Sequence, residues 1–128
     1  KLVHPEKKIL AVCGDGGFMM NCQEFETALR AKTPFVTLVF NDSSYGLIKW
    51  KQMDQYGKSC CVDFTNPDFV KFAESMGAIG YRITKAEDLV PTLKKAFEQN
   101  VPVIIDCPVD YAENTKLTAH LKELMEKL

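Results

Sequence analysis

The chain has 128 residues, of which 46% are apolar and 26% are charged, a balance typical of one soluble globular domain. Sixteen basic and seventeen acidic side chains leave a formal net charge of −1, which argues against a protein that binds nucleic acid through phosphate contacts. No apolar run approaches the roughly 20 residues that a membrane-spanning helix needs. The sequence begins at Lys1 rather than at a methionine, and we expect it to be a fragment or an excised domain.

The five cysteines do not form a metal-binding pattern. No C-x-x-C occurs, and the two histidines, His4 and His120, lie at opposite ends of the chain, so a zinc site is not expected. The favoured interpretation is five reduced thiols in a cytoplasmic protein. A redox role for the neighbours Cys60 and Cys61 is the alternative.

The first predicted elements are a strand and a helix. Residues 9–13 predict a buried strand, which ends in the glycine-rich turn 14–17. Asn21 is the expected N-cap of the following helix, with Glu24 completing a capping box. Thr33-Pro34 ends this helix.

The central part of the chain predicts a second strand and a second helix. Residues 35–40 are rich in β-branched and aromatic side chains and predict a strand, which ends in the turn 41–44. A helix is expected over residues 47–55. The stretch 57–64 has no clear periodicity and is expected to be an irregular loop.

Two more helices and two more strands follow. Pro67 suits the first turn of a helix that Gly77 ends, and residues 79–83 predict a third strand. A capping box at residues 84–87 opens the next helix. Residues 101–107 predict the fourth strand.

This alternation predicts an α/β fold, a parallel sheet with helices on both faces. Strands that are apolar on all sides agree with burial on both faces. From about Thr115 the tail has leucines along one side and predicts a terminal amphipathic helix. Ligands of such sheets bind at the carboxyl ends of the strands, so the turns after the first two strands are the candidate site.

The first turn, residues 14–17, combines glycines with one carboxylate. Glycines at a helix entrance expose backbone N–H groups that suit a phosphate. The carboxylate of Asp15 would repel a diphosphate unless a divalent cation such as Mg²⁺ lay between them. Met19 stands where the dinucleotide-binding fingerprint needs a glycine, and no P-loop motif occurs.

The second turn adds Asn41 and Asp42, and Asp42 lies 27 residues after Asp15. This is the length of one strand-helix-strand unit. If the first two strands are adjacent and parallel, their ends lie roughly 5 Å apart laterally, and both carboxylates can meet one cation. Taken alone, each motif is more often a tight turn or a helix cap. Their joint occurrence after two predicted strands favours a site.

The motif Gly14-Asp15-Gly16, followed by Asn41-Asp42, resembles the thiamine-diphosphate motif of the acetolactate-synthase family. The resemblance extends from about Lys7 to Tyr111, and the ending 108–111 is similar to the catabolic, FAD-independent branch. It implies that residues 1–128 form the C-terminal part of a thiamine-diphosphate-binding domain with its fold. It also implies Mg²⁺ bound by Asp15, Asp42 and the carbonyl of Ser44. The cofactor-binding residues that it implies are Gly14, Asp15, Gly16, Gly17, Asp42, Ser44 and Tyr45.

The resemblance further implies the reaction of the parent enzyme, the condensation of two pyruvates to 2-acetolactate and CO₂. The glutamate that activates the cofactor in this family lies in another domain of a neighbouring subunit, so this chain is expected to contain no catalytic residue and to be inactive alone. A parent that is a homodimer or a homotetramer is expected. Biosynthetic members carry a tryptophan where this chain has Lys51, which favours pyruvate as donor and acceptor. Trp50 is expected to face elsewhere, as a packing residue.

Two other interpretations remain open. One is a sister reaction on the same cofactor, by a 2-keto acid decarboxylase or a pyruvate oxidase. The other is a non-catalytic α/β binding module.

Overall fold

The structure, a computed structural model, describes residues 1–112, so the tail helix expected from Thr115 lies outside the described residues. The predicted strands and main helices are confirmed, with small shifts of their bounds. In chain order, the elements are β1 (Leu10–Gly14), α1 (Asp15–Met20), α2 (Glu24–Arg30), β2 (Val36–Asn41), α3 (Gly46–Tyr56), α4 (Phe69–Ser75), β3 (Ile79–Arg82), the 3₁₀ helix η1 (Ala86–Asp88), α5 (Leu89–Ala96) and β4 (Val103–Pro108).

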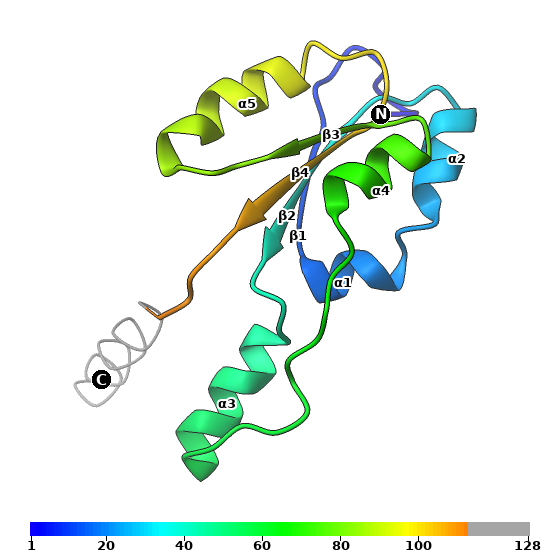
Figure 1. Cartoon of the computed structure of the whole chain (residues 1–128). Coiled ribbons are helices and arrows are strands. Elements are labelled where there is room, and N and C mark those ends of the chain that lie inside the picture. Colours follow the sequence, from blue (N-terminus) through cyan, green and yellow to red (C-terminus); the bar gives the residue numbers. More distant parts are fainter. Residues whose placement is uncertain (113–128) are drawn as a thin grey trace, which may run out of the picture.

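The four strands form one parallel sheet in the order β1-β2-β4-β3 (Figure 1). Gly14 of β1 pairs with Phe40 of β2, and Asn41 of β2 pairs with Pro108 of β4. The first two strands are therefore adjacent and parallel, which is the condition on which the expected meeting of Asp15 and Asp42 depended. All strands run the same way, so their carboxyl ends meet at one edge of the sheet.

Both faces of the sheet are covered, which confirms the predicted α/β class. Helices α2 and α4 lie on one side of the sheet and α5 on the other (Figure 1). Successive side chains of β2 and β4 point to opposite faces, so each strand contributes to two cores. The core on the α2 and α4 side consists of Phe18, Phe25, Val39, Phe69, Ala73, Ala78 and Ile104. The core on the α5 side consists of Val36, Leu38, Ile83, Ala96, Val103, Ile105 and Cys107.

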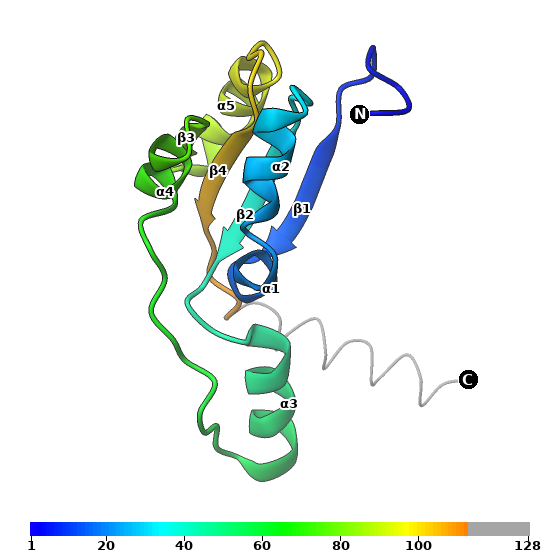
Figure 2. The ribbon, with the colours of Figure 1, turned by 90° about the vertical axis from the view of Figure 1, so that its right-hand side faces the viewer.

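Helix α3 differs from the other helices because it does not cover the sheet. It projects beyond the carboxyl ends of the strands (Figures 1 and 2), and none of its residues is buried. The loop 57–64 that follows has no helix or strand, as expected, apart from an isolated bridge between Ser44 and Asp63. The helix and this loop thus lie together beyond the carboxyl edge of the sheet.

Several local predictions were wrong. Strand β1 is not buried: Leu10 is 41% exposed and Val12 54%, because β1 pairs with β2 alone and is an edge strand among the described residues. The turn 14–17 is instead the direct entry into α1, whose first residue is Asp15. Neither predicted capping box forms: the residue before α2 is Gln23, with no side-chain cap. The other box fails because Lys85, not Thr84, precedes η1.

Helix α4 begins after its N-cap Asp68, so Pro67 lies just before the helix and not, as the sequence had indicated, in its first turn. The Asp68 carboxylate accepts hydrogen bonds from the backbone N–H groups of Val70 and Lys71. Gly77 follows the end of this helix with φ of 85°, a left-handed conformation that favours glycine, as the sequence predicted.

Replacing Asp68 with alanine is expected to lower the melting temperature of the protein by several degrees at neutral pH, because the first turn of α4 loses its cap. The Lys71 N–H and, more weakly, the charge of Arg82 hold the pKa of Asp68 below its usual value of 3.8. A group with a lowered folded-state pKa stabilises the fold above its unfolded-state pKa, and this is lost as pH falls through the folded value. The difference between the two proteins should therefore shrink in strong acid. Thermal unfolding at a series of pH values checks this, and a constant difference would contradict it.

All five cysteines are free, which agrees with the favoured interpretation of reduced thiols. The sulfur atoms of Cys60 and Cys61 lie 3.3 Å apart, as two thiols in a hydrogen bond.

Across residues 1–112, no helix combines the length and the apolar character needed to cross a membrane.

Candidate functional site

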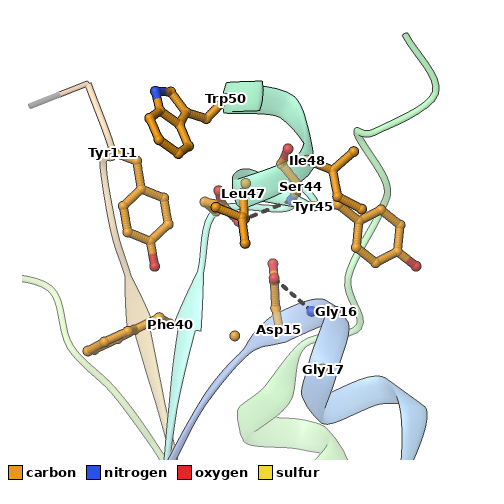
Figure 3. Close-up of a pocket in the computed structure, with 13 residues that line it drawn as sticks. Asp15, Gly16, Gly17, Phe40, Ser44, Tyr45, Leu47, Ile48, Trp50 and Tyr111 are labelled. Atoms are coloured by element: carbon orange, nitrogen blue, oxygen red, sulfur yellow. Dashed lines mark hydrogen bonds between the residues drawn. The ribbon is translucent and has the colours of Figure 1, made fainter. Parts of the chain in front are cut away.

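A cavity of about 510 Å³ lies at the carboxyl edge of the sheet, between the ends of β1 and β2 and the start of α3. Figure 3 shows its lining, with Asp15 after β1, Leu47 and Trp50 across from it, and the ring of Tyr45 beside Gly16. The full lining is Gly14, Asp15, Gly16, Gly17, Phe40, Asp42, Ser44, Tyr45, Gly46, Leu47, Ile48, Trp50 and Tyr111.

Asp15 is the most constrained polar group of the cavity. It follows β1 directly and is only 2% exposed. One carboxylate oxygen, Oδ1, accepts from the Gly16 N–H at 2.8 Å (Figure 3). The other, Oδ2, accepts from the Ser43 N–H at 2.7 Å and from Asn66 Nδ2 at 2.6 Å. These charge-assisted hydrogen bonds satisfy the ionised carboxylate and fix its orientation.

Asp42 brings a second carboxylate to the same cavity, from the end of β2. The Ser44 N–H donates to its Oδ1 at 3.2 Å, which orients the side chain within its own turn. Burial, and then the negative charge of Asp15, raise the pKa of Asp42 above its usual value. The two carboxylates are therefore close enough to repel, and a cation between them would relieve this repulsion.

The glycines around the cavity have two different roles. A Cβ on Gly46 would lie 2.8 Å from Asp42 Oδ2, and a Cβ on Gly16 would lie 2.8 Å from the ring of Tyr45. At these positions glycine lets the backbone approach the neighbouring side chain. Gly14 and Gly17 have no heavy atom within 4 Å of a built Cβ, so their backbone faces open space.

The structure brings all seven predicted site residues to this one cavity: Gly14, Asp15, Gly16, Gly17, Asp42, Ser44 and Tyr45. The expectation that Trp50 faces elsewhere was wrong. Helix α3 lies outside the layers of the sheet, so Trp50 has no core to pack into, and it lines the cavity instead (Figure 3).

Tyr111 is a site residue that the sequence reasoning missed. It follows β4, whose end lies beside the end of β2, and its ring faces the cavity (Figure 3). Burial, and then the charges of Asp42 and Asp15, raise the pKa of its hydroxyl. The rule that ligand sites gather at strand ends would have indicated this residue, had it been applied to β4 as well as to β1 and β2. Tyr111 and Trp50 also line an adjoining cavity of about 470 Å³.

The donor set of the cavity suits a hard divalent cation. In residues 1–112 no group of three or more histidine, cysteine, aspartate or glutamate side chains could hold a metal ion. The two carboxylates would therefore provide only part of a coordination sphere, and backbone carbonyls and ligand oxygens would complete it. Mg²⁺ is commonly bound this way, by one or two carboxylates together with substrate phosphates.

Fold and site together define an α/β domain with a cavity at the carboxyl edge of a parallel sheet, where two carboxylates stand among glycines and apolar side chains. The chain belongs to the family of thiamine pyrophosphate enzymes, whose C-terminal TPP-binding domain matches residues 1–107. This confirms the family that the two motifs predicted.

The similar proteins agree with this assignment. The chain is 44% identical, over 92% of its length, to "Acetolactate synthase" of Bacillus subtilis (strain 168). It is 34% identical, over 97% of its length, to "Acetolactate synthase, catabolic" of Raoultella terrigena. Among solved structures, the Rhodococcus jostii RHA1 thiamine diphosphate-dependent 4-hydroxybenzoylformate decarboxylase superposes with a TM-score of 0.79 at 26% identity, over 88% of this chain and 21% of that one. The chain spans about a fifth of the length of the acetolactate synthases that it matches, 21% and 22%.

Proposed function

We propose that this chain is the C-terminal part of the thiamine-diphosphate domain of an acetolactate synthase, in which residues 1–128 hold the diphosphate end of the cofactor through Mg²⁺. The parent enzyme would condense two pyruvates to 2-acetolactate and CO₂. The names of the acetolactate synthases at 44% and 34% identity support this reaction.

The observation that carries the proposal is the pair Asp15 and Asp42. They stand at the ends of two adjacent parallel strands, both line the cavity, and the charge of one raises the pKa of the other. A carboxylate pair is unfavourable beside a diphosphate unless a cation joins them. Mg²⁺ fits this donor set, with the backbone carbonyl of Ser44 as a third oxygen ligand.

The remaining residues of the cavity would accommodate the diphosphate. Gly14, Gly16 and Gly17 let the backbone at the start of α1 come close to phosphate oxygens, with Gly14 and Gly17 facing open space. The ring of Tyr45 packs on Phe64, with centroids 4.8 Å apart, and lies against Gly16 at the start of α1. When bound, thiamine diphosphate supplies the carbanion chemistry, and this chain binds and orients it.

We assign no catalytic residue to this chain. The isolated 128 residues are proposed to be inactive because the family's activating glutamate comes from another domain. The parent is proposed to be a cytoplasmic homodimer or homotetramer, with pyruvate as its small-molecule substrate.

The test is a product assay on the full-length protein with pyruvate, Mg²⁺ and thiamine diphosphate. After acidification, acetoin derived from acetolactate is expected, and it should depend on both the metal and the cofactor. The isolated 128-residue chain, assayed beside it, should give none. Cofactor-dependent acetoin from the isolated chain would contradict its proposed inactivity.

A sister reaction is the second candidate, and the superposition on a decarboxylase favours it. A decarboxylase would release acetaldehyde from pyruvate, and a phosphate-dependent pyruvate oxidase would give acetyl phosphate. Either product would support thiamine diphosphate as the cofactor and would show that the reaction is not acetolactate synthesis. Absence of any cofactor-dependent turnover, with other 2-keto acids as well, would favour a binding module.

A further inference from the structure

The amide of Asn66 joins the ends of the two strands that carry the site. Its nitrogen, Nδ2, donates to Asp15 Oδ2 at 2.6 Å and to Asn41 Oδ1 at 3.0 Å. Ser43 Oγ lies farther from this nitrogen, at 3.4 Å. An amide nitrogen has two hydrogens, and the two shorter contacts direct one toward Asp15, after β1, and the other toward Asn41, at the end of β2. Asn66 lies in the segment between α3 and α4 and is half-buried, outside the lining of the cavity.

The orientation of both asparagine amides follows from the groups at the ends of this chain of hydrogen bonds. Asp15 is a carboxylate and only accepts, so the NH₂ group of Asn66 must face it. At the far side, Asn41 Nδ2 donates to Asp106 Oδ1 at 2.9 Å, and that carboxylate also only accepts. The carbonyl oxygen of Asn41 is therefore left to accept from Asn66, and no second arrangement satisfies all of these groups.

The same hydrogen bonds continue across the whole sheet. Asp106, on β4, is only 1% exposed, and its Oδ2 accepts from Arg82 Nε at 2.8 Å. Arg82 ends β3 and also donates to Asp68 Oδ1 at 3.2 Å. Asp68 in turn caps α4. The carboxyl ends of all four strands are thereby connected by side chains.

The short segment 66–68 anchors both ends of this network. Asn66 binds at the β1 and β2 ends, and two residues later Asp68 binds at the β3 end. The proline between them fixes its own φ at about −65° and so limits the conformations that this short segment can adopt. Arg82 compensates the buried charge of Asp106. Asp106 in turn orients the amide of Asn41, whose oxygen accepts the hydrogen bond from Asn66.

We propose that Asn66 is a positioning residue for the cation site, a role that rests on the proposed function. Its amide holds the Asp15 carboxylate, with the Ser43 N–H, so that the metal-facing orientation exists before Mg²⁺ arrives. The partner of a metal ligand typically contributes 10- to 100-fold to metal affinity or activity. Asn66 acts through Asp15 and does not touch the cavity.

The test measures Mg²⁺-dependent binding of thiamine diphosphate to the full-length apoprotein by calorimetry, at a series of Mg²⁺ concentrations. Asn66→Ala is expected to raise the half-saturating Mg²⁺ concentration about 10- to 100-fold, with binding recovered at high Mg²⁺. The matched control is Thr84→Ala, which removes a side-chain hydrogen bond of 3.0 Å to Asp88, away from the cavity. It should leave the Mg²⁺ requirement unchanged.

The outcomes separate this inference from the proposed function. If the wild-type protein does not bind the cofactor with Mg²⁺, both are overturned. If the wild type binds and Asn66→Ala lowers only the melting temperature, with an unchanged Mg²⁺ requirement, the positioning role alone is overturned. Should Asn66→Ala fail to fold, Asn66→Ser gives the same readout with a smaller truncation, and an unchanged Mg²⁺ requirement there overturns the role equally.

Discussion

Asp15→Ala is expected to raise the concentration of thiamine diphosphate needed for half-saturation by at least about 100-fold in the presence of Mg²⁺, more than the loss of an outer partner would cause. The variant removes one of the two carboxylates that face the cavity. It also leaves three N–H donors, those of Gly16, Ser43 and Asn66, without their acceptor. The measurement is calorimetric titration of the full-length apoprotein with cofactor at fixed Mg²⁺.

The matched control for this variant is Glu24→Gln. Glu24 is exposed, lies in the first turn of α2 and is absent from the cavity lining, so the loss of its charge should leave cofactor affinity unchanged. An unchanged affinity of Asp15→Ala for thiamine diphosphate would show that Asp15 does not bind the metal. Equal weakening in both variants would indicate a general effect of net charge instead.

The largest expected loss of stability comes from Gly80→Ala, in the middle of β3. A Cβ there would lie 2.5 Å from Val70 Cα and 2.7 Å from Val70 O, backbone atoms of α4 that cannot rotate away. The helix must then move off the strand, which loosens the core around Phe69 and Ala73. Overpacking typically costs 1–3 kcal/mol, and we expect about 3 kcal/mol because the obstruction is backbone. Urea denaturation of the full-length protein measures the change in the free energy of unfolding.

Gly17→Ala provides the comparison for stability. It lies within α1, with no heavy atom within 4 Å of its built Cβ, so alanine should be neutral or stabilising by up to about 1 kcal/mol. A loss in Gly80→Ala no greater than in Gly17→Ala would mean that α4 does not contact β3 as closely as the structure has it.

Much of the fold and of the site was predictable because both depend on short-range patterns. The strands are short runs of apolar and β-branched residues, and their alternation with helices specifies a parallel sheet. The rule that parallel strands present ligand sites at their carboxyl ends then indicates Asp15 and Asp42 from the sequence alone. The structure places both at the same cavity.

The parts that escaped prediction depend on long-range contacts. Asn66 meets Asp15 across 51 positions of the chain, through a segment without periodicity. Trp50 faces the cavity because α3 projects beyond the sheet. Helical spacing in a sequence predicts that a helix forms, but it does not predict where that helix packs. The burial of β1 was overestimated because an apolar strand looks the same at the centre and at the edge of a sheet.

The capping boxes failed for a local reason. The pattern of a serine, threonine or asparagine with a glutamate three residues later is common, and it forms a cap only where the helix begins at that residue. Here α1 occupies the residues before Asn21, and the chain continues in turns until Glu24. The structure of the preceding segment therefore decided the helix start.

The most direct test of a cation site shared by Asp15 and Asp42 is to locate the metal itself. Crystals of the full-length protein, grown with thiamine diphosphate and with Mn²⁺ in place of Mg²⁺, would show the cation by anomalous scattering. We expect one peak in contact with the carboxylates of Asp15 and Asp42, the carbonyl of Ser44 and the diphosphate. A cation bound elsewhere, or a diphosphate bound without a cation at these residues, would contradict it.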